Sequence, residues 1–70
     1  MKDKVNHPEH YTIGGVEAID VIKMKSTPEQ FKGYLNGNIM KYILRWQYKH
    51  GKEDLEKAKW YIDKLIKEVE

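Results

Sequence analysis

The sequence predicts an all-α fold: a small domain of three or four helices preceded by an extended N-terminal arm. Apolar residues recur at helical spacing through the second half of the chain, and clear helix-start signals precede them. A chain of 70 residues has room for one small domain. We therefore expect a single domain over residues 1–70, with a frayed, charged start at residues 1–4.

Composition narrows the function classes. The chain has no cysteine and three histidines, so disulfides, thiolate chemistry and a structural zinc site are not expected. A net charge of +2 is small for a protein that binds long nucleic acid, so such a partner is not expected either. The sequence shows neither a membrane-length apolar run nor the apolar core of a signal peptide. We expect a cytoplasmic protein without membrane contact.

The N-terminal arm is denser in polar chemistry than a tail requires. Pro8 favours an extended conformation at His7, so His7, His10 and Tyr11 are expected to project from an ordered loop. Residues 12–15 end in two glycines and predict a turn. A first helix is expected from Val16 to about Lys25.

The first and second helices each carry a further signal. Glu17 and Asp20 in the first helix are candidate ion-pair partners for cations of the central helix. Thr27, Pro28 and Gln30 form a capping-box pattern and predict the start of a second helix.

Gly37 and its neighbours interrupt the second helix in one of two ways. Either Gly37 ends a short helix and Asn38 caps the next, or one long helix passes through a weak point. We favour a break, which would place the free backbone N–H groups at Asn38 where they stabilise an anion.

The central helix is expected to run from about Asn38 to Lys49. One stripe carries an amide, a phenol and three cations: Asn38, Lys41, Tyr42, Arg45 and Lys49. The other side carries a wide apolar arc: Ile39, Met40, Ile43, Leu44 and Trp46. An arc of that width predicts a helix covered on more than one side. The stripe is either a solvated face or a surface that needs a negative partner.

A final helix is expected to begin near Glu53 and Asp54, acids that suit its positive end. Its apolar spacing of three and four resembles a coiled-coil seam, made of Leu55, Ala58, Ile62, Leu65 and Val69. Trp60 lies off this seam. Together with the small size of the chain, that position predicts a homo-oligomer.

No phosphate-binding loop or dinucleotide fingerprint is present in the sequence. Cations supply charge for phosphate, arginine binds it bidentately, and aromatic rings stack on a base. The candidate binding residues are His7, His10, Tyr11, Asn38, Lys41, Tyr42, Arg45 and Lys49. They describe a pocket for a small phosphorylated aromatic molecule, with no metal ligand and no catalytic residue identified.

Five blocks of the sequence form a distinctive series: Asn6-His7-Pro8-x-His10-Tyr11, Val16-Glu17-Ala18-Ile19-Asp20-Val21-Ile22, Glu29-Gln30-Phe31-Lys32-Gly33-Tyr34, Gly37-Asn38-Ile39-x-Lys41-Tyr42-x-x-Arg45 and Glu53-Asp54-Leu55-x-Lys57-Ala58-x-x-Tyr61. In this order they closely resemble a family of small bacteriophage proteins that are described as of unknown function or as nucleotide kinases. The same segment is similar to the C-terminal part of the nucleotide kinase of a short-tailed coliphage.

The resemblance implies a nucleotide-binding protein of an infected bacterial host's cytoplasm. The coliphage enzyme phosphorylates deoxynucleoside monophosphates and has an additional N-terminal region, so binding is expected here and turnover stays open. Three functions follow as alternatives. The protein sequesters a nucleotide immune signal of the host, or it is a nucleoside monophosphate kinase using ATP and Mg²⁺, or it is a non-catalytic helical adaptor for a host protein.

Overall fold

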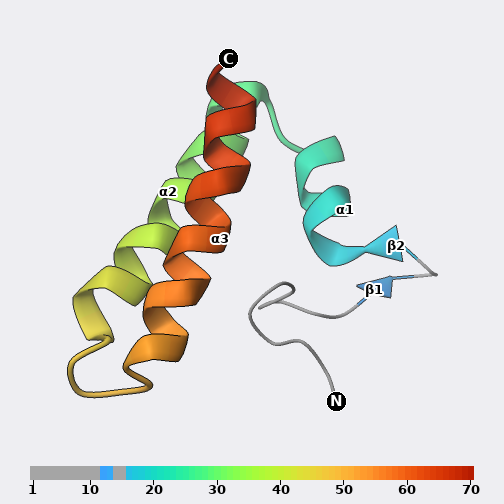
Figure 1. Ribbon diagram of the computed structural model, residues 1–70. Helices are drawn as coiled ribbons and strands as arrows, with labels where there is room; N and C mark the ends of the chain where they lie inside the picture. The colour runs from blue at the N-terminus through green and yellow to red at the C-terminus, as the bar shows by residue number, and fades with distance from the viewer. Residues whose placement is uncertain (1–11, 14–15) are drawn as a thin grey trace.

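The computed structural model describes residues 12–13 and 16–70. Its elements are two short strands, β1 (Thr12–Ile13) and β2 (Val16–Glu17), and three helices, α1 (Ala18–Met24), α2 (Pro28–Arg45) and α3 (Lys52–Val69). Figure 1 shows α2 and α3 side by side in opposite directions, with α1 set beside the end of this hairpin where α3 terminates. The predicted all-α class is confirmed, with three helices forming the domain.

The start of α2 follows the sequence pattern. The Thr27 hydroxyl accepts a hydrogen bond from the Gln30 N–H (3.1 Å), and the Gln30 side chain accepts one from the Thr27 N–H (2.9 Å). Pro28 occupies the first helical position, where no backbone donor is needed. This capping box satisfies two N–H groups locally, so neighbouring residues suffice to set where α2 begins.

The break expected near Gly37 is wrong, because α2 is one continuous helix. Asn38 does not cap a new helix; its amide nitrogen donates to the Tyr34 carbonyl one turn earlier (3.0 Å). Gly33 and Gly37 lie on the exposed side of α2. Each lowers helix stability by about 1 kcal/mol, which packing of the opposite side outweighs. The anion site expected at a helix N-terminus here is therefore wrong as well.

The first helix begins later than expected. Val16–Glu17 pairs antiparallel with Thr12–Ile13, so α1 starts at Ala18. The Ser26 hydroxyl donates to the Ile22 carbonyl (2.6 Å) just after α1 ends. Of the expected turn at residues 12–15, the first two residues form β1, and the two glycines lie outside the described residues.

The connection between α2 and α3 is longer than the sequence suggested. α2 ends at Arg45, and residues 46–51 form a turn in which the Gly51 N–H donates to the Trp46 carbonyl (3.0 Å). Gly51 has a φ of 55°, a conformation that glycine adopts without strain. Lys49 therefore lies in this turn and not on the helical stripe. Glu53 and Asp54 stand in the first turn of α3, as predicted.

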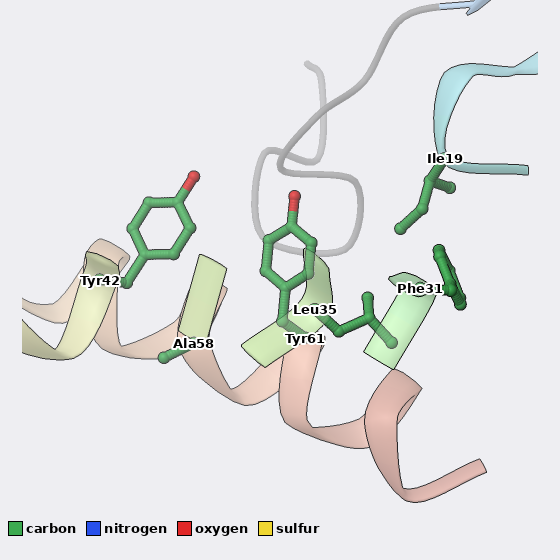
Figure 2. Packing of buried hydrophobic residues seen from close by; sticks show 6 residues of the cluster. All are labelled: Ile19, Phe31, Leu35, Tyr42, Ala58 and Tyr61. Atoms are coloured by element: carbon green, nitrogen blue, oxygen red, sulfur yellow. The ribbon is translucent and has the colours of Figure 1, made fainter. Parts of the chain in front are cut away.

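A small core lies between the three helices. Its apolar members, six of which Figure 2 shows, are Ala18, Ile19, Phe31, Leu35, Tyr42, Ala58 and Tyr61. We call Phe31, Leu35 and Tyr42 the buried line of α2, and Asp54, Ala58 and Tyr61 the buried line of α3. Ile19 brings α1 into the same cluster, and an ion pair joins Lys23 to Glu68 (2.8 Å) beside it.

The predicted seam of α3 is only partly correct. Ala58 is buried and Leu65 packs against the core, as predicted, whereas Leu55, Ile62 and Val69 are exposed. Tyr61 and Asp54, which were not assigned to the seam, are fully buried. The helix is rotated because Tyr61 packs on Tyr42 and Tyr34, and Asp54 forms an ion pair within the hairpin. The spacing of apolar residues alone predicts neither the aromatic stacking nor the ion pair.

The wide apolar arc of α2 is also not covered as predicted. Ile39 packs against the core, but Met40, Ile43 and Leu44 are exposed, and Tyr42 from the polar stripe is buried. Along the described residues, no helix is long and apolar enough to cross a membrane.

Candidate functional site

The candidate site lies at the turn end of the hairpin, around an ion pair between Arg45 and Asp54. Two nitrogens of the guanidinium, Nε and Nη2, each donate to a different carboxylate oxygen of Asp54 at 3.2 Å. The His50 backbone N–H donates to the same carboxylate at 3.1 Å, and His50 Nδ1 lies 3.5 Å from it. The last residue of α2 is thus tied to the first turn of α3 and to the turn between them.

Asp54 is 0% exposed, so its negative charge must be compensated within the protein, and Arg45 supplies that compensation. Burial alone would raise the pKa of the Asp54 carboxyl, but hydrogen bonds from Arg45 and from the His50 N–H outweigh it. The pKa of Asp54 therefore lies below its usual 3.8. The hydrogen bond to Asp54 likewise raises the pKa of Arg45 above its usual value. Both groups are charged across the whole physiological range.

Three cations surround the ring of Tyr42. The Lys41 ammonium lies 4.8 Å from the ring centroid, the Arg45 guanidinium carbon 4.9 Å and the Lys57 ammonium 5.6 Å. Each distance is within the range of a cation–π contact. We call Lys41, Tyr42, Arg45, Asp54 and Lys57 the aromatic–cationic cluster.

The charges of this cluster are only partly balanced by its carboxylates. Asp54 neutralises Arg45, and Glu53 forms an ion pair with Lys57 (3.2 Å). Lys41 is exposed, and no carboxylate of the described residues forms an ion pair with it. A surface with one unbalanced cation between two balanced ones attracts anions.

The Tyr42 ring of the cluster is part of a larger group of packed aromatic side chains. Tyr42 is 3% exposed and stacks on Tyr61, with ring centroids 6.0 Å apart and planes 18° from parallel. Trp60 and Tyr34 meet Tyr61 edge-on at 5.0 and 6.5 Å. Figure 2 shows the Tyr42 and Tyr61 hydroxyls on the same side of the hairpin. Tyr42 therefore positions the cations and has no exposed ring face for stacking a base.

The structure brings some predicted site residues together and separates others. Lys41, Tyr42 and Arg45 form the cluster, and Asn38 lies half-buried on α2 with its amide bonded to Tyr34. Lys49 is exposed in the turn. The N-terminal candidates, His7, His10 and Tyr11, lie outside the described residues. Arg45 pairs with Asp54, and not with the candidate partners Glu17 and Asp20.

Three residues of this region were not predicted as site residues. The sequence pattern places Asp54 in the first turn of the last helix and Lys57 in a family block, but it does not include Asp54, Lys57 or Tyr48 among the candidate binding residues. Asp54, Lys57 and Tyr61 recur at intervals of three and four on α3, which places them along one side. That spacing was the available signal. Tyr48 is exposed in the turn, and its backbone N–H donates to the Arg45 carbonyl (3.1 Å).

A model of a family of proteins of unknown function, DUF3310, matches residues 5–63. The chain belongs to this family. Within the described part of the molecule, the match covers the whole aromatic–cationic cluster and ends inside α3. No cluster of three His, Asp or Glu side chains that could hold a metal ion occurs among residues 12–13 and 16–70.

Two curated phage proteins are similar to the chain. The gene 1.7 protein of Enterobacteria phage T3 is 46% identical over 66 residues, covering 87% of this chain and 40% of that protein. The nucleotide kinase gp1.7 of Escherichia phage T7 is 47% identical over 62 residues, covering 81% of this chain and 32% of that protein. The chain therefore spans well under half the length of these relatives. No solved structure matches it significantly.

Proposed function

We propose that this is a bacteriophage protein that binds a small phosphorylated nucleotide at the aromatic–cationic cluster. The observation that carries the proposal is the gathering of Lys41, Arg45 and Lys57 around Tyr42. The name of the phage T7 relative, a nucleotide kinase, supports a nucleotide as the ligand.

The phosphate would be held by cations that the hairpin has already ordered. Asp54 occupies Nε and Nη2 of Arg45, which leaves Nη1 for a ligand oxygen. Lys41 and Lys57 add two ammonium groups held over the Tyr42 ring. Because these side chains are positioned before binding, less conformational entropy is lost when the phosphate arrives.

The base would be recognised at the edge of the cluster. Tyr48 is exposed beside Arg45 and offers a ring face for stacking. The N-terminal His7, His10 and Tyr11, together with Asn38 and Lys49, complete the residues that we assign to the ligand from the sequence. On this proposal the protein holds the nucleotide without converting it, as a sponge for a host immune signal would.

Binding is tested by Lys41→Gln and Lys57→Gln, measured by titration calorimetry against nucleoside monophosphates and cyclic nucleotides. Each variant should bind roughly 10–100-fold more weakly, the effect of losing one hydrogen bond to a charged group. Lys59→Gln is the matched control, because Lys59 is exposed on α3 and pairs with Asp63 away from the cluster. Equal affinities in all three variants would contradict the proposed site.

The nature of the ligand is tested on protein purified from phage-infected cells. Denaturation should release a phosphorylated small molecule that mass spectrometry identifies. A protein that releases no nucleotide, and whose Tm is unchanged by any nucleotide, would instead fit the helical adaptor.

A kinase is the second candidate function, favoured by the name of the phage T7 relative. Phosphoryl transfer requires Mg²⁺, a positioned acceptor and cations that stabilise the transferred group. Incubation with ATP, Mg²⁺ and each deoxynucleoside monophosphate tests it directly. Formation of a diphosphate would replace sequestration by catalysis, while the same cations would retain their role at the phosphate.

A further inference from the structure

The apolar seam of α3 is left bare within the described structure. Leu55, Ile62, Ile66 and Val69 are spaced by seven, four and three residues, so they line one side of the helix. Their exposed fractions are 38%, 39%, 51% and 61%. A seam of this regularity is typical of a helix that packs on another helix.

Helix α2 extends the same bare surface. At about 100° per residue, Ile39 and Ile43 lie on one side of the buried line of α2, and Arg45 lies on the other. Ile43 is 45% exposed, whereas Ile39 is partly buried and packs against the core at the edge of this surface. On α3, Lys57 and Glu68 lie on the side opposite the seam.

Two contacts indicate that the bare sides of α2 and α3 coincide. Arg45 of α2 and Lys57 of α3 both contact the ring of Tyr42, so these two cations lie on the same side of the hairpin. Lys23 of α1 pairs with Glu68, which lies on the Lys57 side of α3. The seam of α3 and the isoleucines of α2 therefore share the opposite side of the hairpin. We call Ile39, Ile43, Leu55, Ile62 and Ile66 the apolar face.

We propose that a second copy of this chain packs its own apolar face against this one. Helices α2 and α3 are each 18 residues long, so two hairpins match in length and together make a four-helix bundle. Each hairpin contributes one layer, with α1 and the aromatic–cationic cluster on the outside. The proposal is independent of nucleotide binding, which lies on the opposite side.

The charges beside the apolar face favour a copy of the same chain over a charged partner. Lys52 pairs with Glu56 and Lys59 with Asp63, each at 4.0 Å along α3. Lys32 pairs with Glu29 on α2 (3.4 Å). These cations are balanced on their own helix, so two identical faces meet without strong repulsion, and the balanced charges leave little to attract a nucleic acid or an anionic membrane.

One whole side of the hairpin is large enough for a small interface. Helices of 18 residues are about 27 Å long and about 10 Å wide, so two side by side present roughly 540 Å². That area is near the low end of stable interfaces, about 600 Å² per partner, so the pair would use the whole side of the hairpin with the apolar face at its centre. A 70-residue chain has room for only a small core, and the described residues include seven buried apolar side chains, so further burial would stabilise the fold.

The test is Ile43→Glu against Leu44→Glu, measured by sedimentation equilibrium on the full chain. Leu44 is 70% exposed and one position away on α2, but it points about 100° away from the apolar face. Wild type and Leu44→Glu should have a mass of at least two chains, and Ile43→Glu should approach 8.4 kDa with unchanged helical circular dichroism. Ile62→Glu should repeat the result from α3.

Three outcomes would overturn the proposal. They are a monomeric wild type at hundreds of micromolar, an Ile43→Glu variant that keeps the wild-type mass, and equal dissociation of the Leu44→Glu control. Loss of nucleotide binding in Ile43→Glu is not expected, so failure here is distinguishable from failure of the proposed nucleotide site.

Discussion

The two sides of the α2–α3 hairpin differ in chemistry: one is charged and aromatic, and the other is aliphatic. On one side, Asp54 and Arg45 form an ion pair, and three cations surround a stacked tyrosine. On the other side, aliphatic residues stand exposed with charges confined to neighbouring pairs. The ion pair of the first side forms within one chain. The apolar residues of the second side need further apolar surface before they are buried. The difference suggests that binding chemistry and self-association occupy separate sides.

The largest expected effect is on the ion-paired side. Asp54→Ala should lower Tm by roughly 10 °C or more, because removing one partner of a buried pair leaves the other uncompensated. It also frees the His50 N–H at the turn. Thermal unfolding followed by circular dichroism measures the change.

The control for this prediction restores balance to the pair. Arg45→Met combined with Asp54→Leu should recover much of the lost Tm, since two apolar side chains leave no buried charge. Arg45→Lys should give an intermediate Tm, because an ammonium cannot match the two-nitrogen contact. A double variant as unstable as Asp54→Ala would show that the carboxylate acts mainly through the turn.

The same side should show a specific acid sensitivity. The pKa of Asp54 is below 3.8 in the folded protein, so the stability it contributes is present above that value and is lost as pH falls through the lowered pKa. Comparing Tm from pH 7 to pH 2 in wild type and Asp54→Asn isolates this contribution. The gap between the two proteins should narrow below pH 3.8. A constant gap would mean that Asp54 is not the titrating group.

The sequence predicts the local features of this hairpin better than its long-range contacts. The capping box at Thr27 was predictable because its hydrogen bonds join residues three apart. The register of α3 was not, because Tyr61 and Asp54 are buried through long-range contacts with α2. Apolar spacing pointed to Ile62 instead, which is the right pattern for a helix contact but belongs to the bare side.

The candidate site was predictable to a similar extent. Lys41, Tyr42 and Arg45 were identified from one helix face and do lie together. Lys57 comes from α3 and joins them only through the hairpin, so no pattern within α2 could include it. The continuity of α2 through Gly37 likewise depends on packing along its far side.

A smaller effect is expected at the apolar face, where association should make Tm depend on protein concentration. If two chains associate there, Tm should rise by several degrees as the concentration increases from 5 to about 500 µM, since association stabilises the folded state by mass action. Ile43→Glu should remove this dependence, and Lys41→Gln should retain it. A concentration-dependent Tm in Ile43→Glu would place the contact elsewhere.

The smallest expected effect concerns Gly37, which lies on neither side of the hairpin. A Cβ built at Gly37 meets no heavy atom within 4 Å, and the residue is in the interior of a continuous helix. Gly37→Ala should therefore stabilise the protein by about 0.5–1 kcal/mol, raising Tm by roughly 3–6 °C. Nucleotide affinity and oligomer mass should not change. Gly51→Ala is the matched control of opposite sign, because the φ of 55° at Gly51 is strained for alanine. A lower Tm for Gly37→Ala would indicate that α2 bends there or that another chain approaches its backbone.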